Sequence, residues 1–299
     1  MIKVKVPASS ANMGAGFDTL GVAVSLYSRL EVEETESGLI IETKNAGGYV
    51  PTDKNNLVYH AMQTLFDEAG YTPKGLIIHQ NSDIPMTRGL GSSSGCIIGG
   101  MLAANVISGR KLSYGDILDL AAGMEGHPDN VAPALYGGMC VSLPDNGHVI
   151  TRSIKLDPKI KFAVMVPDFF VATKKSRGVL PDNVPRGDAS YNIQRASMFV
   201  YAMEHGDMEL LRYAVSDRLH QDYRKCYIDG FDGIVKHSYE CGARATYLSG
   251  SGPTIVSVID SSYNEFTELM HDYFKANKHE WMCKVLDVDN VGSVVSTLR

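Results

Sequence analysis

A loop rich in glycine and serine carries the strongest chemical signal in this sequence. It spans Pro85–Gly95, reads PMTRGLGSSSG, and stands between an apolar strand pattern and an apolar helix pattern. Its glycines allow backbone conformations that bring N–H groups close to a ligand. Ser92, Ser93 and Ser94 fall where the helix begins, so their N–H groups lack helical partners and lie at the positive end of the helix dipole. Such a segment predicts a phosphate-binding loop.

Two common nucleotide-binding motifs do not fit this loop. A Walker A motif is excluded because no Gly-Lys-Ser/Thr sequence closes it. A dinucleotide fingerprint is excluded because three residues, rather than two, separate Gly91 from Gly95. The structural alternative is a serine cap on an ordinary helix preceded by a tight loop. If the loop holds phosphate, the serine hydroxyls add hydrogen bonds and one of them can bind Mg²⁺.

Two further loops have both a functional and a structural interpretation. Ser249–Thr254 reads SGSGPT between two strand patterns. It is either a backbone nest for an anion or a glycine-rich hairpin turn, and its residues alone favour the turn. Asn12 and Asp18 occur in Pro7–Gly21, a loop of small residues after the first predicted strand. They either contact a ligand or cap turns.

The densest group of proton-handling and cation-handling side chains follows a predicted helix. Glu125, His127, Asp129 and Asn130 fall within six positions of the segment EGHPDNVAPALYGG. Packing alone does not call for so many polar groups in so short a stretch. A zinc pattern is not indicated, because His127 has no second histidine three or four residues away. A carboxylate, a serine hydroxyl and phosphate oxygens together are ligands that suit Mg²⁺.

Alternating and helical patterns give the elements that must position these segments. In the first half, strands are predicted at Lys3–Pro7, Leu30–Glu34, Leu39–Thr43 and Gly75–Gln80, and helices at Asn55–Ala69, Cys96–Ile107 and Tyr114–Glu125. In the second half, strands are predicted at Lys161–Val166, Thr246–Leu248, Thr254–Ile259 and Met282–Val288, and helices at Ser190–His205, Met208–Asp217, Phe231–Cys241 and Tyr263–Ala276. Ser113 is a plausible N-cap for the third helix, with Asp116 in its first turn.

The order of these elements indicates two α+β domains. Turn residues gather at Leu143–Pro158, where we expect the boundary between domains at residues 1–155 and 156–299. In the second domain, the order of strands and helices predicts a sheet with helices on one face.

Composition excludes several classes of protein. The 299 residues are 44% hydrophobic and 21% charged, which suits a packed core. A net charge of −6 argues against nucleic-acid binding, which needs a basic face. The five cysteines form no Cys-x-x-Cys pair and predict reduced thiols in a cytoplasmic protein. No apolar stretch long enough to span a membrane occurs, and the N-terminal MIKVKV lacks a signal-peptide core.

Together, in this order, the four polar segments resemble the GHMP kinase superfamily. The pair SSANMGAGFDTLG and GHPDNVAPALYGG is similar to the homoserine kinase family in particular. So are ATKKSRGVLP, with Thr173 and Arg177 at the family's substrate contacts, and HQDYRKCYIDGF, with Arg224 at its second substrate arginine. The chain departs from the family pattern at Asp222 and Asp229, where proline is usual.

The resemblance implies a fold and a site. The N-terminal ATP-binding domain would be like ribosomal protein S5 domain 2, and the C-terminal domain would be a ferredoxin-like α/β sandwich. ATP would contact the loop Pro85, Met86, Thr87, Arg88, Gly89, Leu90, Gly91, Ser92, Ser93, Ser94 and Gly95, together with Ser249, Gly250, Ser251 and Gly252. Ser93 and Glu125 would hold Mg²⁺. The substrate residues would be Asn12, Asp18, Thr173, Arg177 and Arg224, and the catalytic residues His127, Asp129 and Asn130.

The implied activity is ATP-dependent phosphorylation of the L-homoserine hydroxyl to O-phospho-L-homoserine, in threonine biosynthesis. Positioning and charge neutralisation would drive the transfer, with Asp129 and Asn130 orienting a hydroxyl that loses its proton late. A homodimer is the expected assembly. The alternatives are a kinase of mevalonate or a sugar alcohol, and a metabolite-binding protein without catalysis. Arginines at 177 and 224 with acidic Asp18 and Asp129 favour a zwitterionic amino acid.

Overall fold

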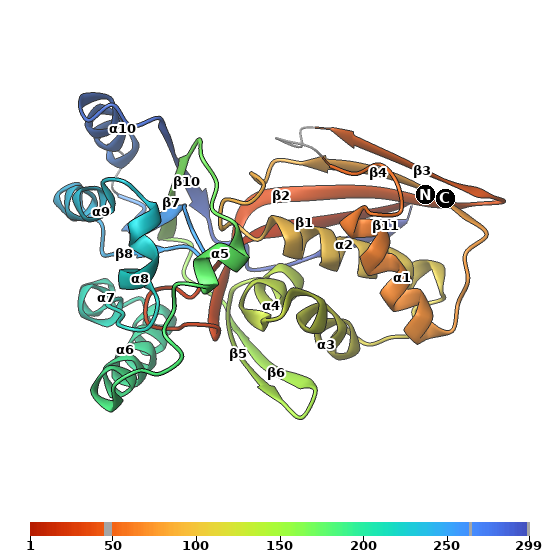
Figure 1. The fold of residues 1–299 in the computed structure, drawn as a ribbon, viewed down its shortest axis with the longest axis horizontal. Coiled ribbons are helices and arrows are strands. Elements are labelled where there is room, and N and C mark those ends of the chain that lie inside the picture. The colour runs from red at the N-terminus through yellow and green to blue at the C-terminus, as the bar shows by residue number, and fades with distance from the viewer. Residues whose placement is uncertain (45–49, 263–264, 298–299) are drawn as a thin grey trace.

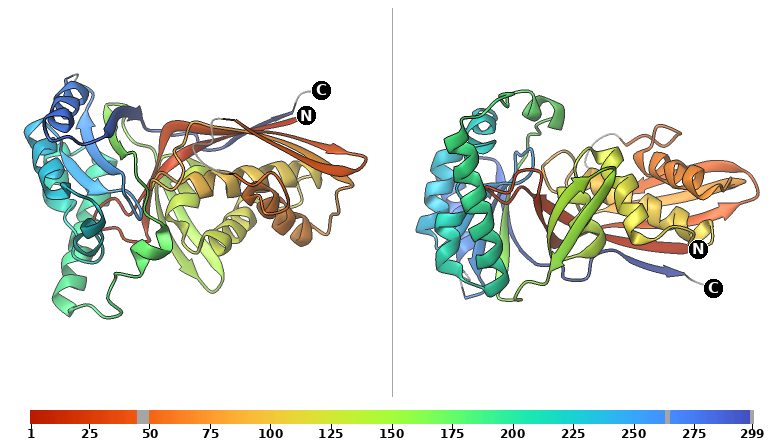
Figure 2. Two further views of the ribbon diagram at one scale, coloured as in Figure 1. Left: turned by 45° about the horizontal axis from the view of Figure 1, so that its top comes forward. Right: turned by 90° about the horizontal axis from the view of Figure 1, so that it is seen from below.

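Two β-sheets organise the chain in a computed structural model, which describes residues 1–44, 50–262 and 265–297 (Figure 1). The first sheet has seven strands and the second has four. Helices α1–α4 lie on one face of the first sheet, and the second sheet with its own helices lies at the other end of the molecule (Figures 1 and 2).

The first sheet is built mainly from the N-terminal half. Its strands are β1 (Ile2–Ala11), β2 (Leu20–Thr35), β3 (Gly38–Lys44), β4 (Gly75–Ser82), β5 (Met139–Asp145), β6 (His148–Ile154) and β11 (Val294–Thr297). The order is β11-β1-β2-β4-β3, with β5 paired to β2 and β6 paired to β5. Because β11 pairs with β1, the last described strand returns to the sheet that the first strand began.

Four helices cover this sheet: α1 (Leu57–Ala69), α2 (Ser92–Ile107), α3 (Tyr114–Glu125) and α4 (Pro128–Tyr136). The predicted cap of α3 is confirmed, because Ser113 and Asp116 form a reciprocal capping box. Helix α2 is apolar on nearly all sides, since it lies between the sheet and the other helices. Its Ile98 and Met101 are fully buried with Val6 and Phe66 in one core cluster.

The second sheet runs in the order β10-β7-β9-β8, all antiparallel. Its strands are β7 (Ile160–Pro167), β8 (Ala245–Leu248), β9 (Ile255–Asp260) and β10 (Trp281–Asp287). The helices of this half are α5 (Thr173–Arg177), α6 (Arg186–His205), α7 (Met208–Ala214), α8 (Gln221–Arg224), α9 (Phe231–Glu240) and α10 (Phe266–Ala276), with a 3₁₀ turn at Lys225–Tyr227.

Helices cover both faces of the second sheet, which differs from the prediction of one covered face. Along β7, Phe162 and Val164 share a core cluster with α6 and α7. The alternate residues Ala163 and Met165 share another with α9 and α10. The sequence of β7 is apolar on both sides, as a strand buried on both faces must be. The start of the predicted last helix, Tyr263, lies outside the described residues.

Most of the turn cluster at Leu143–Pro158 is a hairpin of the first sheet, and its last residues, 155–158, connect that sheet to the second. Asn146 and Gly147 have φ values of 50° and 87°, and they connect β5 to β6. An Asn-Gly pair with two positive φ angles is the usual tight hairpin turn, so these two residues do not themselves mark a domain boundary. The domain limits at 1–155 and 156–299 therefore stay a proposal, with β11 crossing back to the first sheet.

Cysteine burial varies along the chain. Cys140, Cys241 and Cys283 are buried, Cys96 is partly buried, and Cys226 is exposed. All five are free thiols, as the sequence predicts. Burial raises the pKa of Cys96 to about 11 and of Cys140 and Cys283 to about 12.

Candidate active site

A cavity of about 350 Å³ gathers most of the predicted site residues from both halves of the chain. All five predicted substrate residues line it, as do Ser93, Glu125 and the three predicted catalytic residues. From the glycine–serine loop, its walls include Met86, Thr87, Arg88, Gly89, Gly91, Ser92 and Ser93. Pro85, Leu90, Ser94 and Gly95 do not line it, and neither do Ser249 and Gly252.

Two glycines allow the loop to pack closely on its neighbours. Gly91 is the N-cap of α2 with a φ of 68°, a conformation that favours glycine. A Cβ atom there would lie 2.0 Å from the Ser9 hydroxyl oxygen. At Gly89, with a φ of 78°, a Cβ would lie 2.4 Å from the Ser249 carbonyl oxygen. The loop is thus held against β1 and the β8–β9 turn, and the start of α2 opens on the cavity.

Arg88 fixes the loop rather than presenting a charge to the cavity. Its Nε donates to the Pro167 carbonyl at 2.9 Å and its Nη1 to the Met86 carbonyl at 3.3 Å. Its Nη2 donates to the Asp168 carbonyl. With all three nitrogens bonded to backbone oxygens, Arg88 ties the loop to the end of β7.

The Ser249–Gly252 turn is favoured as a structural hairpin over an anion nest. Three of its four N–H groups donate within the protein: Ser249 donates to Thr254, Gly250 to Ala11, and Gly252 to Ser249. Instead the turn presents carbonyl oxygens. That of Gly250 accepts hydrogen bonds from Asn12 Nδ2 and from Arg224 Nη1, both at 3.0 Å.

Ser93 and Glu125 lie together at the start of α2 and the end of α3. The Ser93 hydroxyl donates to Glu125 Oε1 at 2.6 Å. This pair supplies oxygen atoms only, on the wall of the cavity, and hard oxygen ligands are what Mg²⁺ prefers. The donor set therefore fits a magnesium ion that also contacts phosphate oxygens.

A second group of possible metal ligands has different chemistry. Asp18, His127 and Asp129 place ligand atoms within 4.8 Å of one another. However, Asp18 already receives two hydrogen bonds from Arg177, at 2.7 and 3.1 Å. Asp129 Oδ1 is 2.5 Å from His127 Nδ1. Because these carboxylates have charged or hydrogen-bonding partners, the group fits an organic cation better than a metal.

His127, Asp129 and Asn130 come from the start of α4. Burial lowers the pKa of His127, but the hydrogen bond and charge of Asp129 outweigh it, so that the net pKa is raised. Asn130 Oδ1 accepts a hydrogen bond from the Ser9 hydroxyl at 2.9 Å, and Asn130 lines the cavity. These side chains can orient a hydroxyl group.

Two guanidinium groups meet above one aromatic ring. The Arg177 and Arg224 guanidiniums lie 5.6 and 5.2 Å from the centre of the Phe17 ring. Arg224 is buried, and burial together with the charge of Arg177 lowers its pKa to about 10. Burial also lowers the pKa of Arg177, but the hydrogen bonds and charge of Asp18 outweigh burial, so the net pKa is raised. This corner of the cavity therefore holds the charges that could bind a carboxylate beside a cation.

The far end of the cavity was missed by sequence reasoning. It is lined by Thr43, Lys44, Val50, Pro51, Asn55, Asn56, Leu57, Gln80, Ser82 and Cys96. Asn56 caps α1 and also donates to Gln80 Oε1 at 3.1 Å. The asparagine before α1 was recognisable as a cap, but nothing local in the sequence shows that a cap also lines a cavity.

Comparison with known proteins agrees with this geometry. Residues 56–138 match the family model of the GHMP kinases N terminal domain, and residues 199–268 that of the GHMP kinases C terminal domain. A homoserine kinase of Caldicellulosiruptor bescii is 46% identical over 100% of this chain and 98% of its own length.

The chain belongs to the homoserine kinase family of GHMP kinases. It is therefore a phosphotransferase. A solved homoserine kinase of Cytophaga hutchinsonii superposes with a TM-score of 0.88 at 27% identity, covering 99% of this chain and 97% of its own. A mevalonate kinase of Methanococcus jannaschii has a TM-score of 0.71 at 16% identity, over 96% and 98% of the two chains, and shares the fold alone.

The two departures from the family pattern lie away from the cavity wall. Asp222 is exposed at the start of α8, where it forms an ion pair with Lys225 at 3.1 Å. Asp229 is also exposed. Neither lines the cavity, so these substitutions change the surface beside Arg224 and not the site itself.

Proposed function

We propose that the protein transfers the γ-phosphoryl group of ATP to the side-chain hydroxyl of L-homoserine, giving O-phospho-L-homoserine for threonine biosynthesis. The observation that carries this proposal is the charge arrangement beside the start of α2. Arg177 and Arg224 lie over the Phe17 ring, Arg177 pairs with Asp18, and all three charged side chains line the cavity that the proposed phosphate loop also lines. A zwitterionic amino acid satisfies both signs of charge at once.

The substrate would exchange partners with an existing ion pair. Its carboxylate would take hydrogen bonds from Arg177 and Arg224, whose planar groups suit a carboxylate. Its ammonium group would take the place of Arg177 on Asp18 and approach Asp129. Asn130 would then orient the hydroxyl, with Asn12 and Thr173 completing the wall.

The phosphates of ATP would lie at the start of α2, which has no side-chain cap and whose Ser92 and Ser93 line the cavity. Magnesium held by Ser93 and Glu125 would supply neutralisation of the charge on the phosphate oxygens. The two residues fit that role by their 2.6 Å contact and their oxygen ligands. His127 and Asp129 would set the local charge around the reacting hydroxyl.

A substrate panel tests the activity. Purified protein with ATP and Mg²⁺ is offered L-homoserine, mevalonate or a sugar alcohol, ADP release is followed, and phosphorus NMR identifies the product. We expect turnover and an O-phosphate ester with L-homoserine. Turnover of mevalonate, with none of L-homoserine, would overturn the substrate assignment while leaving the kinase fold intact.

We also propose a cytoplasmic location and a homodimer. Free thiols support the location, and among the residues described no helix is long and apolar enough to cross a membrane. Ile193 and Tyr201, on α6, and Tyr213, on α7, are exposed apolar side chains that a second copy can cover. Sedimentation velocity of the purified protein tests the dimer, and a single species of monomer mass would contradict it.

A further inference from the structure

The loop that carries Asn12 and Asp18 has a strained backbone. Asn12, Met13 and Asp18 have φ values of 67°, 46° and 54°, in a region that residues other than glycine rarely occupy. Such conformations persist only where the surroundings hold them in place. Part of the support is local, since Asn12 Oδ1 accepts from the Asp18 backbone N–H at 2.9 Å. Further support comes from a buried polar cluster outside the cavity wall.

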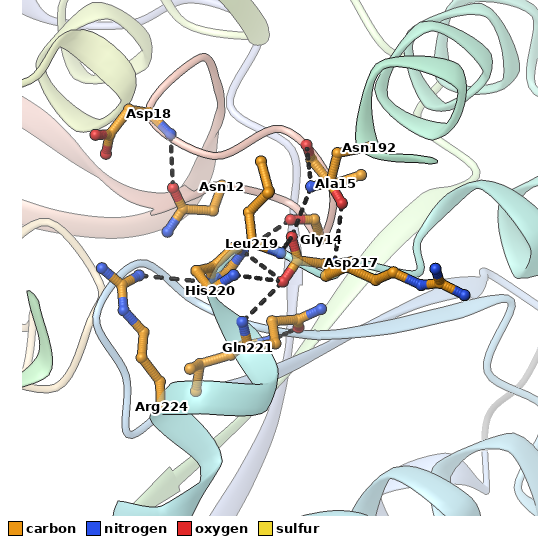
Figure 3. Close-up of polar contacts among 12 residues, drawn as sticks. Asn12, Gly14, Ala15, Asp18, Asn192, Asp217, Leu219, His220, Gln221 and Arg224 are labelled. Carbon is orange, nitrogen blue, oxygen red and sulfur yellow. Dashed lines mark hydrogen bonds and ion pairs between the residues drawn. The ribbon is translucent and has the colours of Figure 1, made fainter. Parts of the chain in front are cut away.

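This cluster consists of Asn192, Asp217 and His220 (Figure 3), all of which are buried. His220 Nε2 lies 2.8 Å from the Gly14 carbonyl oxygen, and Asn192 Nδ2 donates to the Ala15 carbonyl at 3.2 Å. The two side chains, which do not line the cavity, thus hold the middle of the loop in place. A Cβ on Gly14 would lie 2.1 Å from the Val215 carbonyl oxygen, which shows how closely the loop packs on this segment.

Asp217 organises the cluster with four hydrogen bonds. It accepts from Asn192 Nδ2 at 2.7 Å and from the backbone N–H groups of Leu219, His220 and Gln221 at 3.0, 2.9 and 2.7 Å. Burial raises its pKa, but the hydrogen bonds that it accepts lower the pKa, and the net pKa is lowered. An ionised Asp217 therefore fixes the start of α8, the helix that carries Arg224.

The hydrogen-bond partners of His220 decide its tautomer. Arg224 Nη1 lies 3.4 Å from His220 Nδ1, and a guanidinium only donates. Nδ1 must therefore accept, and Nε2 carries the hydrogen that is donated to the Gly14 carbonyl. Asp217 Oδ2 is 3.7 Å from Nε2, beyond hydrogen-bond distance. Burial lowers the pKa of His220, in keeping with a neutral ring.

One imidazole thus connects two walls of the amino-acid site. One nitrogen holds the loop that presents Asp18, and the other faces Arg224. Its ring also stacks on Phe17 at 5.3 Å, the ring that both arginines cover. His220 does not line the cavity.

We propose that His220, held by Asp217 and Asn192, is a positioning residue that sets the geometry of the amino-acid site without touching the amino acid. This inference rests on the proposed function, since it assigns the role to the site for L-homoserine. Its consequence is selective: losing His220 weakens binding of the amino acid and leaves the ATP site, held by α2 and its loop, unchanged.

Three variants separate the two contacts. His220→Asn keeps an acceptor near Arg224, His220→Gln keeps a donor near Gly14, and His220→Leu removes both. We expect the KM for L-homoserine to rise roughly ten- to a hundredfold in His220→Leu and less in the other two. The KM for ATP should stay within about twofold of wild type in all three.

The matched control is Ser238→Ala. Ser238 is fully buried and donates to the Ile234 carbonyl, in the core between α9 and α10. This variant should lose stability without changing the KM for L-homoserine. A folded His220→Leu variant with an unchanged KM for L-homoserine would overturn the proposal. So would an equal rise in KM for both substrates. If His220→Leu does not fold, the same comparison of KM for L-homoserine with KM for ATP is made on the Asn and Gln variants.

A spectroscopic measurement on the wild-type protein tests the contacts directly. Nitrogen-15 NMR of histidine-labelled protein should show His220 as the neutral Nε2–H tautomer at neutral pH. A proton on Nδ1, or a doubly protonated ring, would contradict the geometry. This readout does not depend on the substrate. If the wild type did not phosphorylate L-homoserine, only the proposed function would be contradicted. The measured tautomer would still show whether His220 makes the contacts described.

Discussion

At the residue scale, Asp18 and Arg177 form an ion pair across the cavity with both carboxylate oxygens engaged. Both side chains are about one-third exposed, at 33% and 38%. A ligand that carries only one charge would leave one member of this pair without a partner. A zwitterion replaces both members and leaves neither uncompensated, which gives the cavity a preference by charge before shape is considered.

Arg177→Met tests this preference. The truncation should lower kcat/KM for L-homoserine by roughly thirtyfold to several thousandfold, because it leaves a carboxylate poorly paired in a partly desolvated cavity. The loss in kcat/KM should be much smaller for an amino alcohol that resembles L-homoserine but lacks its carboxylate. Steady-state kinetics on both substrates checks this. Lys174→Met, at an exposed position on the same helix, is the control. Equal losses on the two substrates would mean that Arg177 does not bind the carboxylate.

Glu125→Ala tests the magnesium site. Removing one oxygen ligand should lower kcat by roughly a hundredfold or more at saturating ATP, since metal neutralisation of phosphate charge contributes several kcal/mol. The fold should persist, because Glu125 is only partly buried at the end of α3. Glu68→Ala, on the exposed side of α1, is the control. Turnover near the wild-type rate at saturating Mg²⁺ would remove Glu125 from the site.

The sequence identified the side chains of the cavity better than their partners. Asp18, Glu125 and Asn130 lie in short motifs, and the polar residue types in those motifs indicate a functional site. Nothing in those motifs shows that Arg88 bonds three backbone carbonyls or that Asp217 accepts four hydrogen bonds. Such partners are set by tertiary packing between segments far apart in the chain.

At the element scale, α2 positions the proposed phosphate loop because nearly all of its apolar surface is packed. Long periodic elements such as α3 were predicted with correct ends. Short ones such as α5 and α8 were missed, because five or four residues carry too little periodicity to detect. Strand β2 was predicted only in part, since its first residues, LGVAVS, are small and apolar without clear alternation.

A pair of glycine substitutions tests how tightly the loop is held. Gly91→Ala places a Cβ 2.0 Å from the Ser9 hydroxyl oxygen at a positive φ, so either the start of α2 or the Ser9 side chain must move. Gly95→Ala adds only ordinary contacts, the nearest at 3.5 Å. We expect ATP affinity, measured by calorimetry, to fall roughly tenfold or more in Gly91→Ala. It should be near wild type in Gly95→Ala. Equal affinities in two folded variants would contradict the assigned role of the loop.

The Asp217 carboxylate, which accepts hydrogen bonds from N–H groups at the start of α8, makes stability depend on pH. The pKa of Asp217 is lowered in the folded state, so its stabilising effect is present above the unfolded pKa of about 3.9 and is lost as pH falls further. The difference in free energy of unfolding between wild type and Asp217→Asn should therefore shrink as pH drops below about 4. Urea unfolding at a series of pH values measures it. A difference that does not vary with pH would contradict the lowered pKa.

At the scale of the whole molecule, one core cluster joins the two sheets. It contains Met13 and Val22 from the first sheet and its loop, with Phe162 and Val258 from the second. The cavity lies where these parts meet, so the site depends on both. No sequence pattern indicates this shared core, because its members are ordinary apolar residues in distant segments.

Cooperative unfolding follows from the shared core. The one tryptophan, Trp281, lies in β10 and reports on the second sheet, while far-ultraviolet circular dichroism reports on all elements. We expect the two signals to give the same midpoint and the same slope in urea. A fluorescence transition clearly separated from the dichroism transition would show that the two sheets unfold independently.

Cys226 offers a built-in site for a fluorescent label. It is the exposed cysteine, while burial raises the pKa of Cys96 and holds its thiol in the unreactive form at neutral pH. A maleimide dye should therefore attach to the 3₁₀ turn that follows Arg224, with no cysteine removed from the chain. The emission of that dye would follow the arginine's own segment as the amino acid enters, which makes the protein a reporter of its own occupancy.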